Sequence, residues 1–250
     1  MDAHTQVPAR AYAKRIDERR LRRAAKAIVD AYSRLARDAS HLLAPILDGA
    51  PPRQWQHYPA EDAIDCTRRY QWYYHSHDPQ DRAGSGEHGH FHLFARLEGV
   101  ANELDEKTER AFLRKLGTRR RCASTRHLLA ISMNAVGVPI SLFTVNRWVT
   151  GDLPLSGAAT LQLLRRMRLS TDHPLIDSIL TAVIRLHDPE IEALIAERDR
   201  SLFARAARGP SALDDETLEV TSSVAIDVDR RLVEVGRGRT RPGVRPARRR

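Results

Sequence analysis

The sequence predicts an α+β fold in which a small antiparallel sheet of about four strands, formed by two hairpins, packs against N-terminal and C-terminal helices. Three observations lead to this prediction. Apolar residues recur at helical spacing near the N-terminus, two pairs of β-rich segments occupy the middle, and capped helical segments come after them. The sequence contains no internal repeat of roughly 20 to 50 residues, which excludes solenoids and propellers.

The first segment, residues 8–43, is expected to form one amphipathic helix. Ala24, Ile28 and Leu35 recur at three- or four-residue steps and define its apolar face, while the other face is strongly basic. The sequence LDGAPPRQ at 47–54 then breaks the periodicity with Gly and paired Pro. The helix is therefore predicted to be separate from the β-rich part of the chain.

Two hairpins are predicted in the middle of the chain. Residues 69–77 and 88–97 are rich in aromatic or alternating residues and flank a polar loop that contains Gly. Residues 127–134 and 140–150 form a second β-rich pair, which a short turn sequence connects. These four segments make up the predicted sheet.

The remaining periodic segments are expected to be helical. They are residues 103–117 between the hairpins, then 156–168, 172–186 and 188–208, with a last short element at 226–235. The expected N-caps are Ser156, Asp172 and Asp188.

The chain of 250 residues, with 42% hydrophobic and 29% charged residues, is long enough for one sizeable core. We expect an N-terminal basic helix in residues 1–46, a single α+β domain in 55–235 and a disordered Arg-rich tail in 236–250. Cys66 and Cys122 are too few for a disulfide scaffold. No apolar run is long enough for a membrane span or a secretory signal, so we expect a cytoplasmic protein without a membrane partner.

The net charge is +9, and seven Arg residues of this excess lie in the last fifteen residues, 236–250. The rest of the chain therefore carries only +2. A flexible Arg-rich tail can bind nucleic acid without sequence preference and with strong salt dependence. Nonspecific nucleic-acid binding through this tail is thus one functional hypothesis, although no motif for sequence-specific recognition is present.

Five of the eleven histidines fall within eighteen residues, at positions 75, 77, 88, 90 and 92. Alternation along a strand places His88, His90 and His92 on one face, and His75 and His77 follow the same parity. Paired strands would crowd these imidazoles into one patch. A divalent metal ion would satisfy such a cluster, because neutral imidazole is a preferred ligand of Zn, Fe, Cu and Mn.

The predicted centre is mononuclear, and the sequence does not identify its metal. Its candidate ligands, with Glu87 as an oxygen ligand or as a base that orients a ring, are His75, His77, His90 and either His88 or His92. The alternative is that these histidines line a solvated sheet face without meeting. Whether the centre would belong to a metal-dependent enzyme or to a binding protein without turnover stays open.

The sequence HGHFHLF at 88–94 resembles the histidine-triad nucleotide-binding motif. Gly89 stands where that family has a larger apolar residue. The resemblance implies a nucleotide hydrolase or transferase in which His90 attacks the α-phosphate and His88 and His92 support it. Separately, His75-x-His77 followed by Glu87 is similar to part of the cupin metal motif, with a longer gap before the acid.

The arrangement as a whole, including VNRWVTGD at 145–152, resembles an uncharacterised bacterial family of unknown function. In that segment Asn146 and Arg147 stand at the end of a predicted strand. If the histidine face adjoins them, Asn146 could orient a small-molecule substrate and Arg147 could bind its carboxylate or phosphate. The alternative is an ordinary strand end with a solvated Arg. The oligomeric state stays open.

Overall fold

The structure is a computed structural model of the chain. It describes residues 9–47, 53, 54, 56–77, 84, 86–118, 124–209 and 212–238. The predicted Arg-rich tail therefore lies almost wholly outside the described residues, as does Cys122, whereas Cys66 is an exposed free thiol.

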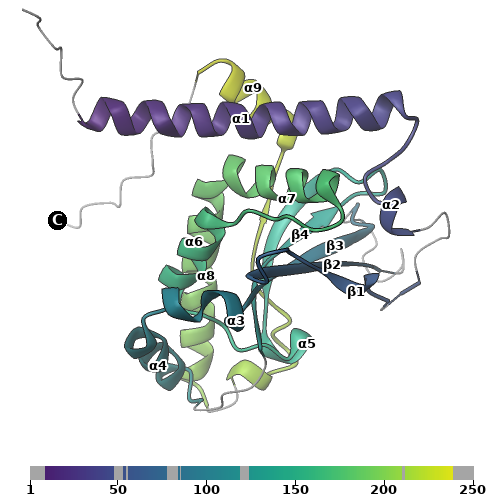
Figure 1. Cartoon of the computed structure of the whole chain (residues 1–250). Helices are drawn as coiled ribbons and strands as arrows, with labels where there is room; N and C mark the ends of the chain where they lie inside the picture. The colour runs from purple at the N-terminus through teal and green to yellow at the C-terminus, as the bar shows by residue number, and fades with distance from the viewer. Residues whose placement is uncertain are drawn as a thin grey trace, which may run out of the picture.

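The described residues form a six-stranded antiparallel sheet beside a layer of helices (Figure 1). The strand order follows the sequence, so each strand pairs with the next one along the chain. The strands are β1 (Tyr58–Ile64), β2 (Tyr70–Ser76), β3 (Gly89–Arg96), β4 (Thr125–Met133), β5 (Pro139–Val145) and β6 (Val220–Ala225). The α+β class and both predicted hairpins are thus present, but the prediction of about four strands is wrong.

The two strands that sequence reasoning missed lie at the two edges of the sheet. β1 (YPAEDAI) contains a Pro and two acids, and its pairing with β2 is interrupted by a bulge. β6 (VTSSVA) is short and polar. Edge strands need no continuous apolar face, so neither segment has the alternation that identifies a buried strand.

The helices precede, interrupt and follow the strands. They are α1 (Ala9–Arg37), α2 (Ala44–Leu47), α3 (Leu97–Val100), α4 (Glu106–Lys115), α5 (Arg147–Thr150), α6 (Gly157–Arg166), α7 (Pro174–Leu186), α8 (Asp188–Ala206) and α9 (Val228–Gly236), with 3-10 turns η1 (Ala101–Glu103) and η2 (Ala212–Asp214). No helix of the described residues is long and apolar enough to cross a membrane.

Several helix boundaries differ from the predicted ones. The N-terminal helix ends at Arg37 rather than continuing to residue 43, and the α7 and α8 N-caps are His173 and His187 instead of the predicted Asp172 and Asp188. Ser156 does cap α6, with its hydroxyl accepting from the Ala159 N–H. Neither His173 nor His187 makes a capping hydrogen bond with its side chain; each helix instead has a Pro in its first turn.

The last part of the predicted strand 140–150 is also helical. β5 ends at Val145, and Asn146 then caps α5 by accepting a hydrogen bond from the backbone N–H of Arg147. Gly151, with φ of 77°, ends this single turn in the left-handed conformation that glycine adopts without strain. The local capping residue therefore outweighs the β propensity of the flanking Val and Trp.

The main core lies between one face of the sheet and the helices. Trp72 and Phe91 on the sheet and Ile28 on α1 are almost completely buried. The indole N–H of Trp72 donates to a carboxylate oxygen of Asp177 on α7 at 2.9 Å, which fixes this face against the helical layer. Because side chains alternate along a strand, the neighbours of Trp72 project to the opposite face of the sheet, where the histidines lie.

Candidate metal centre

The histidine cluster is assembled by one pair of neighbouring strands. β2 and β3 are antiparallel, and their register places His75 opposite His90 and Tyr73 opposite His92. In β3, His90 and His92 alternate with Phe91, which faces the helical core. The pairing therefore brings three imidazoles from two strands to one face of the sheet.

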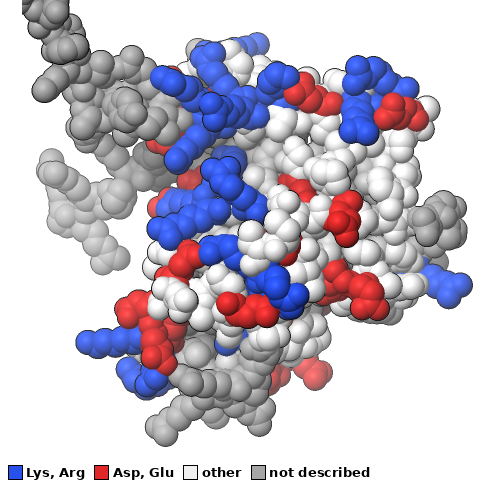
Figure 2. Space-filling view, viewed as in Figure 1, with Lys and Arg blue, Asp and Glu red and all other residues white. Residues whose placement is uncertain are grey.

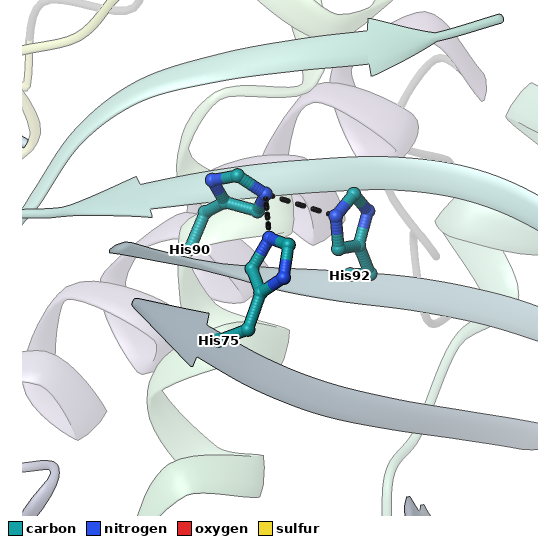
Figure 3. Close-up of side chains that lie close together, drawn as sticks. All are labelled: His75, His90 and His92. Atoms are coloured by element: carbon teal, nitrogen blue, oxygen red, sulfur yellow. Dashed lines mark hydrogen bonds between the residues drawn. The ribbon is translucent and has the colours of Figure 1, made fainter. Parts of the chain in front are cut away.

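The three imidazoles converge on one point, as Figure 3 shows. Nε2 of His90 lies 2.6 Å from Nε2 of His75 and 2.9 Å from Nε2 of His92. Two nitrogen ligands of one transition-metal ion, each about 2.0 to 2.1 Å from it, lie roughly 2.9 to 3.4 Å apart. The His90–His92 distance of 2.9 Å falls within this range, and the His75–His90 distance of 2.6 Å lies just below it. These three side chains could therefore hold a metal ion.

A second group of side chains contacts the other nitrogen of His90. Nδ1 of His90 lies 2.7 Å from Oε1 of Glu87 and 3.2 Å from Nε2 of His77. The other oxygen of Glu87 accepts a hydrogen bond from the Ser132 hydroxyl at 3.0 Å. Together His77, Glu87 and His90 also place three ligand atoms within metal-binding distance of one another.

These contacts determine which nitrogen of His90 is available to a metal ion. A carboxylate only accepts hydrogen bonds, so Nδ1 of His90 donates its proton to Glu87. Nε2 then presents its lone pair to the space shared with His75 and His92. A carboxylate behind a ligating imidazole is the usual arrangement that fixes the ring and raises its basicity.

The cluster is buried and its best-enclosed imidazoles are neutral. His75, His90 and His92 are 8%, 3% and 1% exposed. Burial holds the pKa of His92 well below its usual range, and the neighbouring imidazoles, His90 first, lower it further. Burial also lowers the pKa of His127, whose Nε2 lies 3.0 Å from Nδ1 of His92, to about 3. Neutral imidazole is the form that binds metals.

His88 does not join the cluster. It precedes β3, and its Nδ1 lies 2.6 Å from the hydroxyl oxygen of Tyr74, a residue of the helix-facing core. The absence of a side chain at Gly89 makes this contact possible, because a Cβ there would lie 2.4 Å from that hydroxyl and 2.2 Å from the His75 carbonyl oxygen. Of the two alternatives in the predicted ligand set, His92 is the one that meets His75 and His90.

Asn146 and Arg147 lie apart from the three converging imidazoles and have structural contacts. Asn146 is 1% exposed, caps α5 and donates from Nδ2 to the carbonyl of Ala212, while Arg147 forms an ion pair with Asp214. The cavity that they share with His127 has a volume of only about 10 Å³. Their assignment to substrate binding stays a prediction.

Sequence reasoning missed two residues around the cluster. His127 on β4 contacts His92, and Ser132 on the same strand donates to Glu87. Both lie in the predicted strand 127–134, but only the pairing of β3 with β4, which places His90 opposite Ser132, brings them to the histidines. The spacing of His127 and Ser132 in the sequence gives no signal for this.

Comparison with known proteins gives a family and no function. The profile of a family described as "Domain of unknown function (DUF6969)" matches residues 22–226. No curated protein and no solved structure matches the chain. The matched segment includes all the strands of the described sheet, and thus all the histidines of the cluster.

Proposed function

Since the chain belongs to the family described as domain of unknown function (DUF6969), we propose its function from the side-chain geometry: it binds one divalent transition-metal ion through His75, His90 and His92. The observation that supports this proposal most strongly is the convergence of three Nε2 atoms from buried imidazoles. Without an ion, the one lone pair on Nε2 of His90 faces the Nε2 atoms of both His75 and His92. A metal ion would take the place of the protons between these nitrogens and would accept one lone pair from each of the three.

His77 and Glu87 complete the proposed centre from the other side of the His90 ring. One oxygen of Glu87 accepts the hydrogen bond from Nδ1 of His90, and its second oxygen accepts a hydrogen bond from the Ser132 hydroxyl. Three imidazole ligands are typical of centres that leave a coordination position open. A metal ion in such a centre supplies Lewis-acid chemistry toward water or a small-molecule substrate. A ligand set of nitrogen and oxygen atoms suits Zn, Fe, Cu and Mn alike.

The alternative hypotheses receive less support. For the histidine-triad resemblance, His90 would have to attack a phosphate, yet both of its ring nitrogens face other side chains at 2.6 to 3.2 Å. The Arg-rich tail that would bind nucleic acid lies almost wholly outside the described residues. Both remain predictions.

The test is metal content and affinity of the full chain. We expect one equivalent of Zn²⁺ or another divalent transition ion per chain after reconstitution and desalting, and its removal by a chelator. His75→Ala and His90→Ala should each weaken binding at least about 100-fold, which is roughly 2.7 kcal/mol. His41→Ala is the matched control, because His41 is exposed and lies outside the cluster, and it should bind as the wild type does.

Three results would overturn the proposal. These are the absence of binding by the wild-type chain, full retention of the ion by His90→Ala, and equal weakening in His41→Ala. Circular dichroism of the metal-free variants separates lost ligation from lost folding. If His90→Ala fails to fold, the His75→Ala and His92→Ala variants carry the test, since each removes one converging nitrogen and leaves His90 in place.

A further inference from the structure

A groove lined by arginine lies on the helical side of the molecule, on the opposite side of the sheet from the histidines. It has a volume of about 970 Å³ and lies between α1, the C-terminal end of α6 with the segment after it, and α7. Figure 2 shows Lys and Arg side chains gathered along α1 and beneath it. The arginines of the groove are Arg20, Arg23, Arg165, Arg166, Arg168 and Arg185.

The one acidic residue in the described lining of the groove does not neutralise its arginines. Asp177 is the single acid among its described lining residues, and it is 4% exposed. Its oxygens accept from the Trp72 indole N–H and from the backbone N–H and hydroxyl of Thr171. Both oxygens of this carboxylate therefore already accept hydrogen bonds, and the bond from Trp72 connects α7 to the sheet.

Three of the six arginines already have partners. Arg165 forms ion pairs with Asp188 and Glu192 on α8, and Arg166 pairs with Glu103. The guanidinium of Arg185 donates to two backbone carbonyls at the end of α6. These contacts hold the wall of the groove in place.

The other three arginines give the groove its uncompensated charge. Arg20, Arg23 and Arg168 form no ion pair or side-chain hydrogen bond with any residue that the structure describes. Burial lowers the pKa of Arg185 and the charges of Arg168 and Arg20 lower it further, whereas Asp188 and Tyr70 act in the opposite direction. The guanidinium groups are thus close enough to repel one another, and a multivalent anion would relieve that repulsion.

The hydroxyl groups of α7 fit the same ligand chemistry. Ser178, Thr181 and Arg185 line the groove from one stripe of the helix at three- and four-residue spacing. Guanidinium forks bind phosphate oxygens in pairs, and hydroxyl groups add further donors. A phosphate-rich ligand would therefore find donors on both walls.

We propose that this groove binds a small ligand with two or more linked phosphate groups. Its volume lies within the range of about 300 to 1,000 Å³ that small-molecule sites occupy. Its described lining contains no aromatic side chain, so it lacks the stacking platform that single-stranded nucleic acids use. Ala24, Ala27 and Leu169 supply an apolar part of the lining. The proposal does not depend on the metal centre.

The experiment is calorimetric titration of the full chain at about 0.15 M salt, where surface charges are screened beyond roughly 8 Å. The probes are inorganic tripolyphosphate, a nucleoside triphosphate and orthophosphate. We expect tripolyphosphate to bind at least tenfold more tightly than orthophosphate. Equal affinity for tripolyphosphate and the nucleotide would identify the phosphates as the whole recognition element, and tighter nucleotide binding would add a contact to its organic part.

Two double variants of equal charge locate the site. Arg20→Ala with Arg23→Ala removes two groove arginines, and we expect it to weaken tripolyphosphate binding at least tenfold. Arg19→Ala with Arg22→Ala removes two exposed arginines of α1 that do not line the groove, and its effect should stay below twofold. Because all four side chains are exposed, both variants are expected to fold, which thermal melting without ligand checks.

Three outcomes would overturn the proposal. One is the absence of saturable tripolyphosphate binding up to about 1 mM, the concentration that corresponds to roughly 4 kcal/mol. Another is equal weakening by the two double variants, which would reduce the effect to net charge. The third is binding of a single-stranded oligonucleotide more tightly than either polyphosphate, which would make the groove part of a nucleic-acid surface.

Discussion

The Glu87→Gln substitution tests the proposed centre more finely than removal of a ligand does. Glu87 contacts Nδ1 of His90 at 2.7 Å and the Ser132 hydroxyl at 3.0 Å, and its side chain is 9% exposed. The amide of glutamine has the same shape and can still accept from His90, so the substitution removes the charge and keeps the geometry. Glu87 is thus tested as a positioning residue that acts through His90.

The expected magnitude comes from the loss of a charge-assisted hydrogen bond. Such a bond contributes about 1.5 to 3 kcal/mol, and a neutral one about 0.5 to 1.5. The difference of roughly 1 to 2 kcal/mol corresponds to a five- to thirtyfold lower metal affinity for Glu87→Gln. This agrees with the 10- to 100-fold losses typical when the partner of a ligating histidine is changed.

The assay is competition titration of Zn²⁺ against a chromogenic chelator, with Glu98→Gln as the control. Glu98 on α3 pairs with Arg68 and Arg96 at 46% side-chain exposure, so its substitution changes the net charge equally and leaves the cluster untouched. Wild-type affinity in Glu87→Gln, while His75→Ala loses the ion, would refute the role of Glu87 and leave the histidine ligands standing. Equal losses in both glutamine variants would reduce the effect to overall charge.

Three further predictions concern stability. Asp177→Ala leaves the buried indole N–H of Trp72 without its acceptor and should lower the free energy of unfolding by about 3 kcal/mol in urea titrations; a loss below about 1 kcal/mol would contradict this. Gly89→Ala should cost about 1 to 3 kcal/mol because its Cβ would overlap the neighbouring strand, whereas Gly209→Ala, with open space around it, should change stability by less than about 0.5 kcal/mol. Burial raises the pKa of Asp152 above its ordinary value of 3.8, so ionisation of Asp152 lowers the stability of the fold as the pH rises above 3.8. In unfolding measurements from about pH 4 to 7, we therefore expect the stability of Asp152→Asn relative to the wild type to increase with pH. A relative stability that falls as the pH rises would refute the assignment.

The sequence predicts the fold class and the local part of the candidate site. Alternation in the segments at 69–77 and 88–97 identifies β2 and β3, and the same parity places His75, His90 and His92 on one face. Period-two patterns carry this information because each side-chain direction is set by the strand itself.

The remaining features depend on tertiary contacts. The pairing of β3 with β4 brings His127 and Ser132 to the cluster, and no spacing in the sequence encodes it. The polar edge strands β1 and β6 are stabilised by one neighbour each and need little apolar pattern. At Asn146, a side chain that caps a helix replaces the strand that its neighbours favour.

The compact origin of the candidate ligands has a consequence for folding. His75, His90 and His92 come from one hairpin, so the entropy lost in bringing them together is that of closing one loop, residues 77–88. The groove arginines, by contrast, come from positions as distant as Arg20 and Arg185 and meet only when the first helix docks on the seventh. The proposed metal ion could therefore bind early and stabilise the pairing of β2 with β3. The groove, by contrast, could bind anions only after α1 has packed against α7.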